Sequence, residues 1–171
     1  MSLASVLNEA SDDDARVSLT RCCGSSRWVE GVLARRPFTD DAAVYDAAEA
    51  VWKDASKDDV LEALTHHPEI GANLDALREK FASTANWSAG EQGAVAVADE
   101  ETLVALRDGN VAYRERFGHI FVVCATGKSA KEMLGLLEAR MENDPEGEIW
   151  VAAAEQGKIT RIRLEKLAAS G

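Results

Sequence analysis

Residues 56–68, SKDDVLEALTHHP, contain the helix-start pattern that decides the fold, followed by apolar residues at helical spacing. Serine followed three residues later by an acid marks a helix start, because the hydroxyl and the carboxylate satisfy amide donors that the first turn leaves unpaired. The same spacing occurs at three other places: Ser11 with Asp14, Ser88 with Glu91, and Ser129 with Glu132. Because each start precedes apolar residues at helical spacing, the chain is predicted to be all-α.

Other helices are expected between these starts, on the evidence of apolar spacing and end signals. They are Arg27–Leu33, Asp41–Ala55 with Asp40 as its cap, Leu74–Phe81, Glu101–Phe117, and a last and longest one from Pro145 to Leu167. The run Ile120–Cys124 is strand-like but has no obvious strand partner, so it is predicted to be an extended segment buried among helices. The expected fold is a compact single-domain bundle of about eight to nine helices over residues 1–171.

Composition and charge exclude several classes of partner. The chain has 171 residues with 29% charged and 46% hydrophobic side chains, as globular domains do. Its formal net charge of −11 repels phosphates and anionic lipids, so neither nucleic acid nor a membrane is an expected partner. Cys22, Cys23 and Cys124 lack the spacing of a disulfide framework and are expected to be reduced. With no targeting signal and no apolar run that could span a bilayer, the expected compartment is the cytoplasm.

His67 is the first candidate for chemistry, because an imidazole gives and takes protons near neutral pH. A residue before proline is pushed out of helical geometry, so His67 is expected at a bend, where its side chain can project into a cleft. The alternative is a solvent-exposed histidine at a helix end. No metal site is expected, because the neighbouring His66 and His67 point in different directions and no HxxxH or HxH spacing occurs.

Three other segments have a structural and a functional interpretation. Ser88 to Gln92 reads as a helix cap, but a capped N-terminus facing a cleft also offers amide donors to a carboxylate, and Gln92 adds a neutral donor and acceptor. Cys22 and Cys23 are better interpreted as packed residues at a helix end than as nucleophiles. The run Phe121 to Ala125 is core by default, and a ligand would meet its backbone groups.

Several separated segments, taken in order, resemble the family of decarboxylases that act on 2-oxo-4-hydroxy-4-carboxy-5-ureidoimidazoline (OHCU) in urate degradation. These segments are residues 19–28 (LTRCCGSSRW), 65–71 (THHPEIG), 88–92 (SAGEQ), 116–125 (RFGHIFVVCA), 143–145 (NDP) and 158–164 (KITRIRL). The resemblance implies an all-helical, cofactor-free homodimer that converts OHCU to (S)-allantoin. Such an enzyme acts after urate oxidase and hydroxyisourate hydrolase, which other proteins would supply.

The resemblance also implies roles for individual residues. His67 matches the catalytic histidine, the expected general acid, and Glu91 would act beside it. The implied substrate-binding residues are Pro68, Ser88, Glu91, Gln92, Phe121, Val122, Val123, Cys124 and Ala125. One departure is Thr126, which stands where many members have an arginine, with Lys128 two positions further on.

Two other functions remain open at this point. One is a different lyase or hydrolase of a related ureido compound, an alternative that Thr126 supports. The other is a helical interaction domain without chemistry, in which the caps are only caps and His67 is an exposed loop residue. Substrate competition separates the first from OHCU decarboxylation, and the absence of pH-dependent activity would mark the second.

Overall fold

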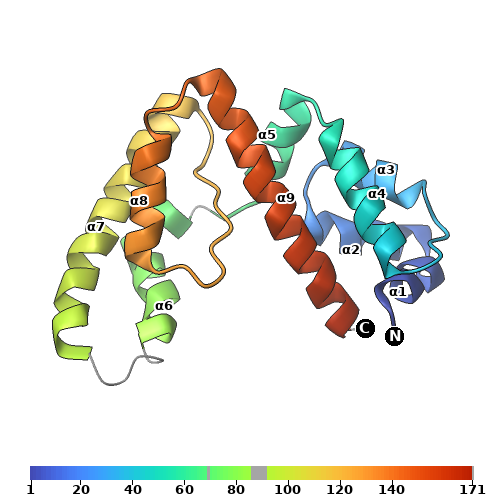
Figure 1. Ribbon diagram of the computed structural model, residues 1–171, viewed down its shortest axis with the longest axis horizontal. Helices are drawn as coiled ribbons and strands as arrows, with labels where there is room; N and C mark the ends of the chain where they lie inside the picture. Colours follow the sequence, from blue (N-terminus) through green and yellow to red (C-terminus); the bar gives the residue numbers. More distant parts are fainter. Residues whose placement is uncertain (69, 86–91, 171) are drawn as a thin grey trace. The chain divides into compact units, whose positions relative to one another are not determined.

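The computed structural model describes residues 1–68, 70–85 and 92–170, and these residues form helices without any strand. Their elements are α1 (Leu3–Glu9), α2 (Asp12–Cys22), α3 (Ser26–Leu33), α4 (Asp41–Lys53), α5 (Lys57–Thr65), the short 3₁₀ helix η1 (Ile70–Ala72), α6 (Leu74–Ala85), α7 (Gln92–Phe117), α8 (Ala130–Arg140) and α9 (Pro145–Ser170). The predicted all-α class is therefore confirmed (Figure 1). Within the described ranges, no helix combines the length and apolar character needed to cross a bilayer.

The predicted serine caps form where the structure describes them. The hydroxyls of Ser11, Ser56 and Ser129 each accept a hydrogen bond from the amide three residues on, and Ser56 completes a capping box with Asp59. The fourth predicted pair, Ser88 with Glu91, lies outside the described residues. Local hydrogen bonding at the first turn therefore sets the start of α2, α5 and α8.

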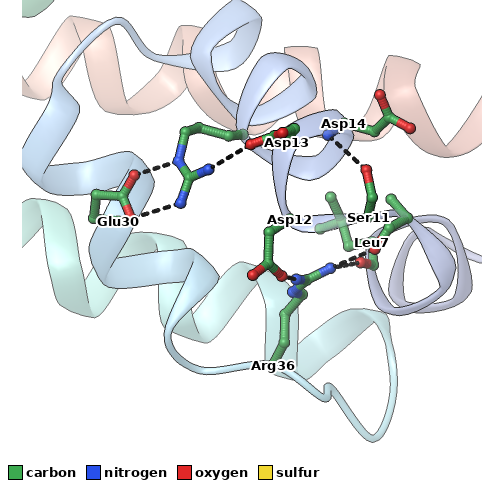
Figure 2. Close-up of polar contacts among 9 residues, drawn as sticks. Leu7, Ser11, Asp12, Asp13, Asp14, Glu30 and Arg36 are labelled. Atoms are coloured by element: carbon green, nitrogen blue, oxygen red, sulfur yellow. Dashed lines mark hydrogen bonds and ion pairs between the residues drawn. The ribbon is translucent and has the colours of Figure 1, made fainter.

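Helix α1 was not predicted, because part of what holds it lies far away in the sequence. Arg36 donates hydrogen bonds to the carbonyls of Leu7 (2.7 Å) and Ala10 (2.9 Å) at the end of α1 and pairs with Asp12 at the start of α2 (Figure 2). The last carbonyls of a helix have no partner within it, so a guanidinium there stabilises the helix end. Apolar spacing within a seven-residue helix cannot reveal such a distant partner.

The chain divides into two compact units, which we describe separately. Unit 1 comprises Met1–His67 and Ala153–Gly171. Its core buries large side chains from α1 to α5 and from α9, namely Leu3, Leu7, Leu19, Trp28, Val44, Leu64 and Leu164. The indole N–H of Trp28 donates to the Ala48 carbonyl at 3.1 Å, so this buried aromatic residue also has its polar group satisfied.

Unit 2 comprises Pro68–Ala152. Its core buries Leu77, Phe81, Leu103, Leu106, Met133 and Leu137, and α7 lies alongside α8 (Figure 1). A Cβ at Gly109 of α7 would approach the Leu137 side chain to 2.6 Å, so this glycine permits the close packing of α7 on α8. That packing explains why α7 continues through a residue of low helix propensity.

The extended segment of unit 2 follows α7. Gly118 ends the helix with φ of 78°, and Gly127 has φ of 74°; both lie in the left-handed region that glycine adopts at little cost. Between them, Val122 and Cys124 are buried while Phe121, Val123 and Ala125 are half-buried against the core of the unit. Because this alternation has the two-residue period of extended backbone, the predicted buried extended segment is confirmed.

Candidate functional site

His67 follows the end of α5 in unit 1. His66 is the C-cap of that helix, and the amide of His67 donates to the Leu64 carbonyl at 3.2 Å. Pro68 comes next and disfavours helical geometry at His67, as the sequence predicted. The side chain of His67 is half-buried, whereas that of His66 is exposed. The prediction of a bend is therefore confirmed, and the alternative of a fully exposed histidine at position 67 is wrong.

The surroundings of His67 favour its neutral form. Burial lowers the pKa of the imidazole below its ordinary value of ~6.5, and the positive charges of Arg163 and His66 lower it further. A hydrogen bond between Nε2 and the side-chain oxygen of Gln156 acts in the opposite direction and raises this pKa. The neutral ring therefore predominates near neutral pH, and the imidazolium, where it forms, is a stronger acid than an ordinary one.

A pocket of about 250 Å³ lies within unit 2. Its walls come from η1, from one face of α7 and from the start of the extended segment, and they consist of Pro68, Gly71, Ala72, Asn110, Val111, Arg114, Glu115, Ile120 and Phe121. Pro68 and Phe121 are two of the predicted substrate-binding residues. The volume is below the ~300–1,000 Å³ typical of drug-sized ligands, so this pocket suits a smaller molecule. Asn110, Arg114 and Glu115 give it polar groups that can orient such a molecule.

A buried ion pair fixes the extended segment that provides one wall of this pocket. Arg140 donates to the Val122 carbonyl at 2.6 Å and to a carboxylate oxygen of Glu148 at 2.6 Å. Glu148 is 0% exposed, and it also accepts hydrogen bonds from Tyr113 (2.6 Å) and Asn143 (2.8 Å). Burial and the hydrogen bond to Glu148 raise the pKa of Tyr113, so its hydroxyl remains a donor. The guanidinium also lies over the Phe121 ring, 4.5 Å from its centroid.

Lys128 contacts the other end of the same segment. Its ammonium donates to the Cys124 carbonyl at 2.8 Å, and Thr126 lies exposed in the intervening turn. Where many family members have an arginine, this chain therefore has the neutral hydroxyl of Thr126 at the surface. Lys128 is positioned as a support for the backbone of the wall.

The structure describes most, though not all, of the predicted site residues. Pro68 and Phe121 line the pocket of unit 2, and residues 122–125 continue its wall segment. Ser88 and Glu91 lie outside the described residues. Gln92 is the first residue of α7, but its side chain is not described. Among the described side chains, no group of three or more histidine, cysteine, aspartate or glutamate residues is arranged to hold a metal ion.

The cysteines of unit 1 behave as packing residues. Cys22, Cys23 and also Cys124 of unit 2 are buried and form no disulfide bond, as expected for reduced thiols. Burial raises the pKa of both Cys22 and Cys23 to about 11, so neither carries the thiolate needed for nucleophilic attack at neutral pH. The structural interpretation of this pair is therefore supported.

Sequence reasoning missed a basic cavity within unit 1. Arg21, Arg163 and Lys166 come together around a space of about 370 Å³, although α2 and α9 are far apart in the chain. Arg163 donates to the Arg21 carbonyl at 3.2 Å and also affects the pKa of His67. The spacing of Arg163 and Lys166, three residues apart, places both on one face of α9, but only the fold brings Arg21 of α2 beside them. In a chain of net charge −11, this is a local source of positive potential.

The fold and these features define an all-α protein with a titratable histidine and a small, partly apolar pocket. The OHCU decarboxylase family model matches residues 8–165. The chain is 37% identical over 161 residues to the uric acid degradation bifunctional protein TTL of Arabidopsis thaliana, covering 93% of this chain and 48% of that protein. It therefore spans about half the length of that relative. It is 27% identical over 159 residues to 2-oxo-4-hydroxy-4-carboxy-5-ureidoimidazoline decarboxylase of Haloferax volcanii, covering 92% and 91% of the two chains.

A solved structure gives the same result. The crystal structure of OHCU decarboxylase in the presence of (S)-allantoin is similar with a TM-score of 0.70 and 34% identity, covering 94% of this chain and 99% of that chain. The chain belongs to the OHCU decarboxylase family.

Proposed function

We propose that this chain is a carboxy-lyase that converts OHCU to (S)-allantoin in urate degradation. The match of the family model over residues 8–165 carries this proposal. The pocket of unit 2 supports it, because it is small, has polar side chains in its wall and is lined by Pro68 and Phe121. A substrate with a ureido group and a carboxylate needs both the polar groups and the shape of such a pocket.

The chemistry requires positioning and proton transfer. When carbon dioxide leaves the ring, the electron pair of the broken C–C bond is delocalised over the conjugated nitrogens and carbonyls of the substrate. The substrate thus serves as its own electron sink, a task for which other decarboxylations use a cofactor. The protein has to orient the leaving carboxylate and deliver one proton to one face of the resulting carbon.

His67 is the proposed proton donor. The half-buried ring, its lowered pKa and its hydrogen bond to Gln156 are the supporting observations. His67 also directly precedes Pro68, a residue of the pocket wall. A general acid of this kind contributes about 10²–10⁴-fold to the rate, and delivery to one face gives one enantiomer.

The other substrate contacts are proposed from the family resemblance. Glu91 and Gln92 orient the ureido and ring N–H groups, and the helix start at Ser88 offers amide donors to the carboxylate. The backbone of Phe121–Ala125 forms the wall, which Arg140 supports through the Val122 carbonyl. The positive charge of Arg163 near His67 adds attraction for an anionic substrate in an otherwise acidic chain.

The assembly and the compartment are proposed from the family resemblance, the exposed apolar side chains and the cysteines. We expect a homodimer, because the family resemblance implies one and because unit 2 exposes the large apolar side chains Val111, Leu136 and Trp150. We expect the cytoplasm, because the three cysteines form no disulfide bond, which fits a reducing compartment. Light scattering of the purified chain tests the first expectation, and a mass equal to one chain would contradict it.

Circular dichroism tests the proposed reaction. OHCU is generated freshly from urate with urate oxidase and hydroxyisourate hydrolase, and the appearance of chiral allantoin is followed. Wild type should form one enantiomer rapidly, His67→Gln should fall to the spontaneous racemic rate, and the exposed neighbour His66→Gln should match wild type. No acceleration by the folded wild type would contradict OHCU as substrate, and competition by a related ureido acid would then favour the alternative lyase or hydrolase. Equal activity of wild type and His67→Gln would remove His67 from its role.

A further inference from the structure

A relay of side chains holds the imidazole of His67 at Nε2. The ring contacts the side-chain oxygen of Gln156, and the Gln156 amide nitrogen donates to Thr160 Oγ1 at 3.0 Å. Thr160 Oγ1 in turn donates to the Cys22 carbonyl at 3.3 Å. Gln156 is 1% exposed and Thr160 is 6% exposed, and both lie in the part of α9 that belongs to unit 1. Because a buried polar group needs a hydrogen-bond partner, these two side chains depend on the hydrogen bonds of this relay.

The direction of each hydrogen bond follows from the carbonyl at the end of the relay. A carbonyl oxygen can only accept a hydrogen bond. The Thr160 hydroxyl therefore donates its single hydrogen to the Cys22 carbonyl. The oxygen of that hydroxyl then accepts from the amide nitrogen of Gln156. This orientation of the amide presents its oxygen to His67, and an oxygen without hydrogen requires a donor at Nε2. The neutral ring is thereby held with its hydrogen on Nε2.

The other ring nitrogen of His67, Nδ1, is the candidate for proton transfer. No described residue forms a hydrogen bond with Nδ1 of His67, and no fully buried side-chain nitrogen or oxygen of the described chain lacks a partner. Within the described part of the chain, Nδ1 is therefore the ring nitrogen that no protein group engages. We propose that Gln156 is a positioning residue that keeps a hydrogen on Nε2 and so makes Nδ1 the nitrogen that donates the proton in the decarboxylation. This inference rests on the proposed function.

The proton transfer balances without rearrangement of the relay. In the imidazolium both nitrogens carry hydrogen. After carbon dioxide leaves, the electron pair on the substrate carbon takes the hydrogen of Nδ1, so that one C–H bond forms and one N–H bond breaks. The ring returns to the neutral form with its hydrogen still on Nε2 and facing Gln156, and water restores the proton on Nδ1. Because Gln156 meets a donor in both charge states, it need not move during the reaction.

A neutral acceptor also suits the pKa of the ring. The groups that act on His67 are Arg163 from α9 and His66 from the end of α5, both of which lower its pKa together with burial. The Gln156 oxygen partly offsets them. A variant without that oxygen should therefore have a still lower His67 pKa and less imidazolium at neutral pH.

Nitrogen NMR of the full chain tests this inference directly. Histidine ring nitrogens are labelled with ¹⁵N, and His67 is assigned by the signals that disappear in His67→Gln but persist in His66→Gln and His119→Gln. Wild type should show a protonated Nε2 in the neutral ring, with a hydrogen that exchanges slowly with water. Gln156→Leu should lose that slow exchange, populate the other tautomer and titrate at lower pH. A neutral wild-type ring with an unprotonated Nε2 would overturn the inference, whatever the activity.

Kinetics supplies the second readout. Gln156→Leu should lower kcat for OHCU by about tenfold, within the range of a general-acid contribution, while KM changes by less than about twofold. Gln156→Glu keeps an acceptor at the same place and should restore the protonated Nε2 with a raised pKa. If Gln156→Leu does not fold, Thr160→Val frees the amide to rotate and should shift the tautomer in the same direction. A folded Gln156→Leu with wild-type kcat, pH profile and Nε2 signal would overturn the role of Gln156, whereas an inactive wild type with the expected spectrum would overturn only the reaction.

Discussion

The two units fix their functional groups with different kinds of partner. In unit 2 a buried ion pair, Arg140 with Glu148, holds the backbone carbonyl of Val122. In unit 1 a neutral amide, Gln156, holds the ring of His67. A charged partner binds strongly and would also stabilise one charge state of the group it holds. The Val122 carbonyl keeps one charge state throughout, whereas His67, as the proposed proton donor, has to change its own. A neutral partner would therefore suit that proposed role.

The largest effect is expected from breaking the ion pair. Glu148→Ala leaves the Arg140 guanidinium buried without its carboxylate and removes the acceptor of Tyr113, which should cost about 3–5 kcal/mol of unfolding free energy. Glu146→Ala is the matched control, because Glu146 lies exposed in the same first turn of α9 and should cost less than about 1 kcal/mol. Urea denaturation measures both. Equal losses in the two variants would show that the buried pair contributes nothing specific to the wall.

The next effect concerns the pH dependence of His67. A general acid must be protonated, so kcat/KM should fall about tenfold per pH unit above the His67 pKa, with a midpoint below ~6.5 because burial lowers that pKa. Stability should change in the opposite direction. A folded-state pKa below the unfolded value means that stability is complete above ~6.5 and is lost as pH falls toward the folded pKa.

Activity and urea midpoints of wild type and His67→Gln, measured over the same pH range, check both parts. The variant should lose the part of the stability change that His67 causes. A midpoint of activity above the ordinary histidine pKa would contradict the assignment of a buried ring with a neutral partner.

The sequence predicted what local hydrogen bonding determines. The caps at Ser11, Ser56 and Ser129 and the bend at His67 follow from residues within four positions of one another, and the structure has each of them. Likewise, Gly118 and Gly127 bracket the extended segment as their lack of a side chain allows.

Local sequence patterns did not predict the side-chain contacts between residues that are far apart in the chain. An acid in the first turn of a helix, as Glu148 is, ordinarily stabilises the positive end of the helix dipole at the surface, yet the structure buries Glu148 against Arg140, one helix earlier. Gln156 gave no signal, because its partner His67 is 89 residues away and a lone glutamine in a helix is ordinarily a solvated residue. Both contacts depend on how the helices pack against each other. Apolar spacing predicts which face of a helix is buried, but it does not predict which atoms of the neighbouring helix that face will meet.

A smaller effect should come from narrowing the pocket of unit 2. A Cβ at Gly71 would overlap the side chain of Asn110, whose amide donates to the Leu106 carbonyl at 2.8 Å. Gly71→Ala should therefore displace the Asn110 amide and raise KM for OHCU by about three- to tenfold, equivalent to ~1 kcal/mol of binding. Gly135→Ala on α8 is the control, because a Cβ there meets no neighbouring atom within 4 Å. A wild-type KM in Gly71→Ala would place the substrate elsewhere.

The smallest effect should come from the second contact that holds the wall. Lys128 donates to the Cys124 carbonyl from a half-buried position, so its hydrogen bond competes with water more than that of Arg140 does. Lys128→Met should cost about 0.5–1.5 kcal/mol of stability and raise KM less than Gly71→Ala does. Lys131→Met, at an exposed lysine of α8, should be neutral in both measurements. If Lys128→Met instead raised KM a hundredfold with unchanged stability, Lys128 would be acting on the substrate itself, and the wall would owe its position to Arg140 and Glu148 alone.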